Sequence, residues 1–321
     1  MFVWVGVRTQ TTKLRLMHQT EWDDLLDRFA AYLTSEGRSQ LTIRNYRREL
    51  RVFVAWYHAA YPELSGPRDL EASDLAEFKA HLETRKLMPA SINLAIASLR
   101  SFLNWAARTK ELNDPPRPPR MIRERRKTPR WLSKPQERRL LKAVRLVDEP
   151  HHVALINLFL VFGLRISEMA GLEWSDVAMG RKHAVLRVRH AKGGKERTLP
   201  FLGNRRARDA FLALGWKEHR REGDRRLLHG QRGPLTASGL KQLLKPYGKL
   251  ADIPDFSAHV LRHTCARRMH EAGQPLDVIK RWMGHESIDT TILYTLPSED
   301  DLARAAGGGA EWDDDWSGAD D

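Results

Sequence analysis

The stretch NDPPRPPRMIRERRKTPR, residues 113–130, separates two parts of the chain that have different patterns. Its prolines forbid a helix, because proline lacks a backbone N–H and clashes with the preceding turn. The same stretch concentrates positive charge in Arg117, Arg120, Arg123, Arg125, Arg126, Lys127 and Arg130. We interpret it as an extended basic linker between two domains. Such a charge run is often merely solvated, but its position favours a strap across a polyanion backbone.

Before the linker, apolar residues recur at helical spacing from Glu21 to Glu111. Gly37 and Pro62 each end such a segment, and Pro89 stands where the fourth segment begins. We therefore expect a small helical domain over residues 18–112. Periodicity starts at Met17, so residues 1–17 are either a flexible leader or the product of a misassigned start.

After the linker, residues 131–306 predict a second, larger domain. Ser133 and Gln136 fit a helical capping box, and HHVALINLFLVFG reads as a central apolar helix. Alternating residues on both sides of Gly193-Gly194 predict a β-hairpin, and further helical segments follow. The fold class expected is thus mainly α with a small β-sheet, an α+β domain. Residues 307–321 are glycine-rich and acidic, which predicts a disordered tail.

The amino-acid composition indicates which classes of partner the protein can bind. The chain has 321 residues, a formal net charge of +13 and a pI near 10.0, which points to a polyanion: nucleic acid first, an anionic membrane surface second. Cys265 is the single cysteine, so no intrachain disulfide and no cysteine-rich zinc site can form. No apolar run is long enough to cross a bilayer, and we expect a cytoplasmic protein without a membrane partner.

The segment HVLRHTCARRMHEAGQPLDVIKRWMGHESIDTTILYT, residues 259–295, carries the densest chemistry. Helical spacing puts His259, Arg262 and His263 on one face, while Gly284 ends a second helix and aims His285 from it. A metal site is disfavoured, because the pair of histidines flanks a guanidinium and lacks the glutamate of a zinc-protease helix. A helix-turn-helix that reads DNA without cutting it is a serious rival on this segment alone. An isolated tyrosine such as Tyr294 is more often a core or surface residue.

Two further positions favour chemistry over binding alone. Arg165 lies at the joint between the central apolar helix and a short helix, where it is either paired with an acid such as Glu168 or kept for phosphate. Lys192 stands at the predicted hairpin turn, which also carries Lys195. Two arginines, a lysine, histidines and a tyrosine suit metal-free phosphoryl transfer, because guanidinium forks can neutralise the equatorial oxygens of the transition state.

The motifs GLRISE, HAKGGKERTLP, HVLRHT and WMGHESIDTTILYT together resemble the catalytic boxes of the tyrosine recombinases, the Xer and phage-integrase group. Their order and approximate spacing match as well. The resemblance covers the whole second domain, and the helical first domain is similar to the family's core-binding, SAM-like domain.

This resemblance implies roles in proton and strand transfer. Tyr294 would attack a scissile phosphate and form a 3′-phosphotyrosyl link. Lys192 would be the general acid for the 5′-oxygen leaving group, and the family's box favours it over Lys195. His259 would assist proton transfer at the tyrosine.

The resemblance also implies roles in holding charge. Arg165 and Arg262 would stabilise the transition state, and His285 would bond a nonbridging oxygen. Glu168 would orient the site, and His263 would be structural.

The expected function is then site-specific DNA recombination without metal, ATP or another cofactor; no G-x-x-x-x-G-K-[ST] loop occurs in the chain. The implied partner is double-stranded DNA with a specific recombination site, bound in the nucleoid by a homo-tetramer or by a hetero-tetramer with a second recombinase. A type IB topoisomerase shares the chemistry but joins no two sites. A non-cutting helix-turn-helix regulator is the alternative from another class, and it predicts no effect of Tyr294→Phe.

Overall fold

A computed structural model describes residues 3–62, 66–123, 129–189, 196–230, 233–285 and 289–292, with side chains from Met17 onward except at 289 and 290. The chain divides into two compact units, residues 1–126 and 127–321, and each has an apolar core of its own. Within the described residues, no helix is long and apolar enough to cross a membrane.

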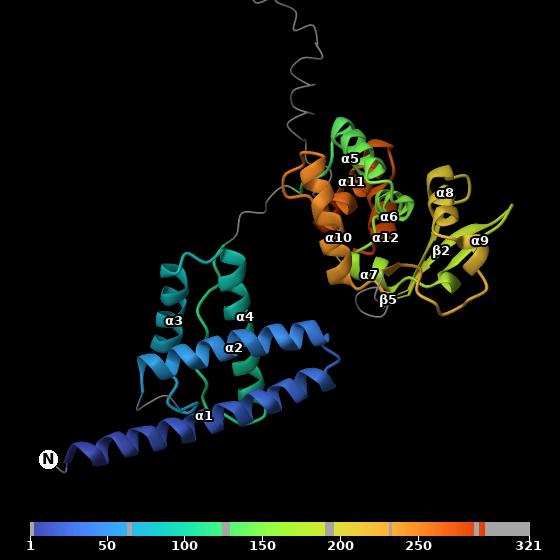
Figure 1. Ribbon diagram of the computed structural model, residues 1–321. Coiled ribbons are helices and arrows are strands. Elements are labelled where there is room, and N and C mark those ends of the chain that lie inside the picture. The colour runs from blue at the N-terminus through green and yellow to red at the C-terminus, as the bar shows by residue number, and fades with distance from the viewer. Residues whose placement is uncertain are drawn as a thin grey trace, which may run out of the picture. The chain divides into compact units, whose positions relative to one another are not determined.

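The first unit is helical (Figure 1). Its elements are α1 (Val3–Ser35), α2 (Gln40–Ala60), α3 (Ala72–Thr84) and α4 (Pro89–Arg108). α1 begins at Val3, inside the stretch expected to be a leader, and no proline interrupts it before its end at Ser35. α2 starts at an N-cap, because the Ser39 side chain accepts a hydrogen bond from the backbone N–H of Thr42.

Aromatic rings hold this unit together. Trp22 of α1 is fully buried and contacts Phe53 of α2 and Phe102 of α4, with ring centroids 5.9 and 5.8 Å away. Phe29, on the same face further along α1, meets Phe102 edge-on at 5.6 Å. α1, α2 and α4 are therefore joined through one shared aromatic cluster.

Residues 115–123, the described first part of the predicted linker, form no helix or strand, and they pack onto α4. Asn93 donates to the backbone carbonyl of Ile122 and accepts from its N–H, at 2.9 and 2.8 Å. Ile122 also lies against the apolar core of this unit. The Asn93 amide thus substitutes for a neighbouring strand and satisfies a backbone that proline-rich sequence leaves without a helical partner.

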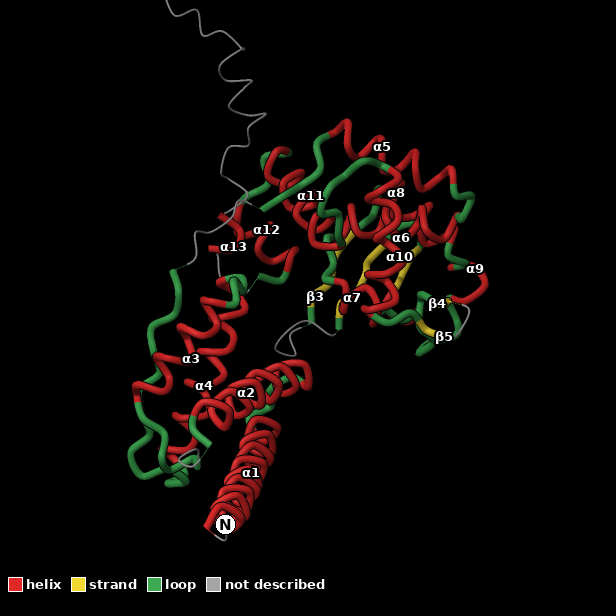
Figure 2. Tube along the Cα trace, turned by 60° about the vertical axis from the view of Figure 1, so that its left-hand side comes forward, coloured by secondary structure: helices red, strands yellow, loops and turns green. Residues whose placement is uncertain are grey.

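The second unit is mostly helical with small sheets, which confirms the expected fold class (Figure 2). Its helices are α5 (Lys134–Leu146), α6 (Pro150–Phe162), α7 (Ile166–Gly171), η1 (Trp174–Asp176), α8 (Arg205–Ala213), α9 (Trp216–His219), α10 (Ala237–Leu250), α11 (Ala258–Glu271), α12 (Leu276–Met283) and α13 (Asp289–Ile292). α6 is the apolar centre: it packs against α5, α8 and α11. α5 opens with the predicted capping box of Ser133 and Gln136.

The strands form two antiparallel sheets. β1 (Val177–Met179), β2 (Ala184–Val188) and β3 (Arg197–Pro200) pair in that order, and β4 (His229–Gly230) pairs with β5 (Gly233–Pro234). β2 and β3 are the arms of the expected hairpin, with Val188 opposite Arg197. The turn that joins them, residues 190–195, lies outside the described residues.

The start of the second unit is fastened to α11. The backbone N–H of Leu132 donates to the hydroxyl of Thr264 at 2.9 Å, and both residues are buried. The guanidinium of Arg267 lies 4.9 Å from the centroid of the Trp131 ring, a cation–π distance. These contacts fix α11, the helix that carries His259 and Arg262.

Candidate active site

The joint between α6 and α7 presents Arg165. α6 ends at Phe162 and is capped by Gly163, whose φ of 59° places it in the left-handed region that glycine tolerates. Two residues later Arg165 is the N-cap of α7, and its backbone N–H donates to Oε2 of Glu168 at 2.9 Å. Glu168, at the third position of the helix, thereby satisfies a backbone donor that the helix start leaves open.

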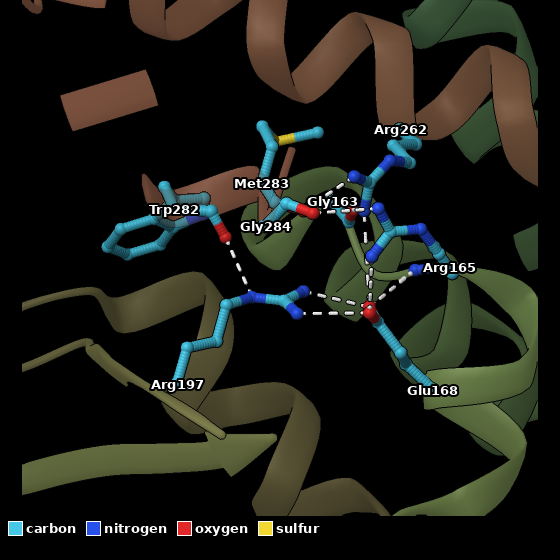
Figure 3. A network of polar contacts seen from close by, with 8 residues as sticks. All are labelled: Gly163, Arg165, Glu168, Arg197, Arg262, Trp282, Met283 and Gly284. Atoms are coloured by element: carbon cyan, nitrogen blue, oxygen red, sulfur yellow. Dashed lines mark hydrogen bonds and ion pairs between the residues drawn. The ribbon is translucent and has the colours of Figure 1, made fainter. Parts of the chain in front are cut away.

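The Glu168 carboxylate is the centre of a network of guanidinium groups (Figure 3). Arg165 Nη1 donates to Oε1 at 2.8 Å, and Arg197 donates from both terminal nitrogens, to Oε1 at 3.0 Å and to Oε2 at 2.8 Å. Arg262 Nη1 lies 4.0 Å from Oε2. Burial raises the pKa of Glu168, but the hydrogen bonds and charge of Arg197, together with the hydrogen bonds of Arg165, more than offset burial, and the net pKa is lowered. Glu168 is therefore ionised.

Arg262 of α11 is buried and reaches two helix ends. Its Nη1 donates to the Gly163 carbonyl at 2.6 Å, and its Nη2 donates to the Met283 carbonyl at 2.5 Å. Arg165 Nη2 donates to the next carbonyl, that of Gly284, at 2.7 Å. The C-terminal carbonyls of α6 and α12 attract cations, because they carry the negative end of each helix dipole. These contacts bring Arg165 and Arg262 together, as Figure 3 shows.

Histidines border the two arginines. His259 lies on the solvent-exposed side of α11, and partial burial, followed by the charges of Arg262 and Arg165, lowers its pKa. His285 follows α12, and burial, followed by the same arginines, lowers its pKa to about 3. A hydrogen bond of 3.0 Å joins its Nδ1 to the Thr291 hydroxyl. Both imidazoles are therefore neutral near pH 7, when one ring nitrogen can accept a proton or hydrogen bond and the other can donate.

His263 is half-buried one helical turn beyond His259, and the two rings meet edge-on with centroids 6.1 Å apart. Burial, with smaller contributions from His259 and Arg262, lowers its pKa to about 4. His263 is thus less exposed than His259.

The structure does not place every predicted residue in this cluster. Lys192 and Tyr294 fall outside the described residues, as do Arg125, Arg126 and Lys127. Arg117, Arg120 and Arg123 are described and exposed, but they belong to the extended segment of the first unit.

Two contributors to the network were missed by sequence reasoning. Arg197 is the strongest partner of Glu168, and Thr291 is fully buried against His285. A signal for Arg197 exists in the sequence. Residues two and four positions apart share one face of a strand, and Leu199 and Phe201 are both buried, so Arg197 is expected on the inward face. Nothing in the sequence singles out Thr291.

The arrangement combines two adjacent guanidiniums with two neutral imidazoles. Guanidinium forks bind nonbridging phosphate oxygens and stabilise charge that develops on them. Across the described ranges, no group of three or more His, Cys, Asp or Glu side chains could hold a metal ion. The chemistry that this geometry supports is phosphoryl transfer with positive charge supplied by arginine.

Comparison with known proteins agrees with the site. Residues 130–300 match the model of the phage integrase family, and residues 26–110 match the model of its N-terminal SAM-like domain. The chain is 32% identical to the tyrosine recombinase XerC of Rhodospirillum centenum, over 86% of this chain and 84% of that protein. It is 30% identical to the tyrosine recombinase XerD of Ralstonia nicotianae, over 85% and 89%.

Solved structures show the same fold. A λ integrase (residues 75–356) dimer bound to a COC′ core site aligns with a TM-score of 0.66 at 18% identity, covering 91% of this chain and 97% of that one. The XerH recombinase in a post-cleavage complex with a palindromic difH substrate aligns with a TM-score of 0.67 at 19% identity, covering 84% and 80%.

Proposed function

Because the chain belongs to the phage integrase family, it is a site-specific tyrosine recombinase that breaks and rejoins DNA, and we propose that Tyr294 is its nucleophile. The tyrosine oxygen forms a bond to the scissile phosphorus, and the bond from phosphorus to the 5′ oxygen breaks. A 3′-phosphotyrosyl link results. Religation reverses the step on a new strand end, so the energy of the phosphodiester is conserved and no nucleotide cofactor is needed.

The side chains divide this step between them. Arg165 and Arg262 bind the nonbridging oxygens, and neutral His285 donates a further hydrogen bond to one of them. His259 accepts the tyrosine proton, which a lowered pKa and an exposed position allow. Lys192 gives a proton to the 5′ oxygen. The observation that carries the proposal is the joint anchoring of Arg165 and Arg262 on consecutive carbonyls, Gly284 and Met283.

The test is covalent capture in the host. Cells expressing the protein or its Tyr294→Phe variant are denatured rapidly, the protein is recovered, and any attached DNA is sequenced. We expect DNA on the unmutated protein alone, with ends at one sequence, which also identifies the recombination site. Equal attachment by both forms would refute Tyr294 as the nucleophile. Attachment at random positions would favour a relaxing activity over site-specific recombination.

We further propose that four protomers assemble on two copies of the DNA site, either as a homo-tetramer or with a second recombinase. Recombination joins strands of two duplexes, so each of the four DNA arms needs a protomer to cut it, and the basic residues Arg117, Arg120 and Arg123 supply exposed charge for phosphate contacts. Mass measurement of the Tyr294→Phe protein on the captured site distinguishes the cases. A stoichiometry of one protomer per duplex at saturation would contradict the assembly.

A further inference from the structure

Arg197 is a buried arginine outside the set assigned to the reaction. It begins β3, and only 9% of its side chain is exposed. All three nitrogens of its guanidinium are used inside the protein: Nε donates to the Trp282 carbonyl at 2.9 Å, and Nη1 and Nη2 both donate to Glu168. This bidentate geometry is the strong form of an arginine–carboxylate pair. The Arg197 guanidinium is therefore shared between the Glu168 carboxylate and the backbone of α12.

The orientation differs from that of Arg165. Arg165 gives only one terminal nitrogen to Glu168 and the other to the Gly284 carbonyl, and 26% of its side chain is exposed. Arg197 points inward from the opposite side of the carboxylate (Figure 3). Arg165 is thus more exposed than Arg197 and gives fewer hydrogen bonds from its side chain to Glu168.

Arg197 compensates the buried negative charge of Glu168. Glu168 accepts four hydrogen bonds, from the Arg165 backbone, the Arg165 side chain and twice from Arg197, which fills both oxygens. A buried carboxylate without Arg197 would have to draw its compensation from Arg165 and from Arg262, 4.0 Å away. Those are the two charges that the phosphate needs.

Arg197 also determines the end of α12. A Cβ built on Gly284 would lie 2.8 Å from Nη1 of Arg197, so the guanidinium fills the space beside this glycine. Trp282 and Gly284, which directly precede His285, thus contact a residue of β3. The same strand continues from the hairpin turn on which Lys192 stands in the sequence.

We propose that Arg197 is a positioning residue for strand cleavage: as the fixed counter-ion of Glu168 it keeps Arg165 and Arg262 available to the scissile phosphate and holds the α12 end that presents His285. The proposal rests on the proposed recombinase function and deepens it.

The test compares Arg197→Met, Glu168→Gln, the double variant Glu168→Gln/Arg197→Met and Arg197→Lys. The probe is a nicked duplex carrying the site recovered by covalent capture, on which the phosphotyrosyl product accumulates. We measure the cleavage rate at saturating protein, the Kd for the same duplex, and thermal unfolding without DNA. Arg205→Met, at a helix start where the side chain is 92% exposed, is the matched control and should leave all three unchanged.

Arg197→Met should slow cleavage by about 100-fold, the effect of losing a preorganised charge in a site, while Kd changes by less than about threefold. The double variant should cleave about tenfold faster than Arg197→Met, because it removes the uncompensated carboxylate together with its partner. Arg197→Lys should lie between Arg197→Met and the unmutated protein, since an ammonium keeps the charge but not the fork.

Other outcomes overturn the proposal. Unchanged cleavage by Arg197→Met would show that Glu168 needs no such partner. A double variant slower than both single variants would indicate independent packing roles, and so would thermal stability that recovers in the double variant while cleavage does not. If Arg197→Met does not fold, the double variant is compared with Glu168→Gln, and a further loss of cleavage refutes charge balance. A lack of DNA attachment by the unmutated protein refutes the recombinase function itself, before any variant is made.

Discussion

Arginines occupy opposite environments in the two units. In the first unit, Arg44, Arg48 and Arg51 are exposed on α2, where they line a shallow groove. In the second unit, Arg197 and Arg262 have side chains only 9% and 5% exposed, around one carboxylate. Exposed guanidiniums act through a field that salt screens, whereas buried ones act through fixed direction. We therefore expect the same residue type to attract DNA in one unit and to direct chemistry in the other.

The largest difference in stability should follow from removing an acidic partner of a buried arginine in one variant and of an exposed arginine in another. Glu168→Ala leaves buried guanidiniums without their carboxylate and should destabilise the second unit by about 3–5 kcal/mol. Asp27→Ala removes the exposed partner of Arg47 and should destabilise the first unit by less than about 1 kcal/mol. Hydrogen exchange, followed on peptides of each unit, measures the two effects separately. Equal effects would mean that burial does not distinguish these ion pairs.

A second comparison replaces arginine by lysine, which keeps the positive charge but loses the planar guanidinium. Arg262→Lys should slow cleavage by about 100-fold, because one ammonium cannot bond the Gly163 and Met283 carbonyls and also meet a phosphate as a planar fork does. Arg48→Lys, at an exposed site, should leave the cleavage rate of bound DNA unchanged. The readout is phosphotyrosyl formation on a nicked duplex at saturating protein. Similar rates for both variants would contradict a directional role for Arg262.

The sequence predicted most of the fold and part of this network. Helical periodicity, the alternation of the hairpin and the ordered motifs are local signals, and they led to the family and to an α+β second domain. Arg165 was expected either to pair with an acid such as Glu168 or to serve phosphate; the structure shows the pairing and leaves part of the side chain exposed.

Local sequence patterns do not predict which residues far apart in the chain come into contact. The carbonyls of Gly163 and Met283 become ligands of Arg262 only because α6 and α12 end beside α11. Thr291 is a similar case, since its hydrogen bond with His285 depends on the path between α12 and α13. Arg197 shares a strand face with the buried residues Leu199 and Phe201, so its inward position could be predicted, but nothing local identifies Glu168 as its partner.

A third comparison uses two glycines that share a backbone conformation. Gly37 of the first unit has φ of 69° and open space where a Cβ would lie, whereas Gly284 has φ of 65° and Arg197 at 2.8 Å. Gly37→Ala should therefore cost only backbone strain, about 1 kcal/mol. Gly284→Ala adds displacement of Arg197, for a total of about 2–4 kcal/mol, and should slow cleavage. Thermal unfolding and cleavage are measured for both variants. Equal losses of stability would show that Arg197 can move away from position 284 at no cost.

The smallest effect should come from the exposed arginines. Replacing Arg44, Arg48 and Arg51 one at a time by Gln should lower the slope of log Kd against log salt by about 0.9 for each phosphate that is no longer neutralised, with only a modest loss of affinity. Binding is measured on the captured site and on unrelated duplex at several salt concentrations. Arg205→Gln, exposed on α8, is the control.

Once DNA is saturated, the α2 variants should cleave at the unmutated rate, because these side chains contribute attraction and not direction. A variant of α2 that lowers cleavage at saturation without changing the salt slope would reverse the assignment, and the distinction between the two kinds of arginine would not hold.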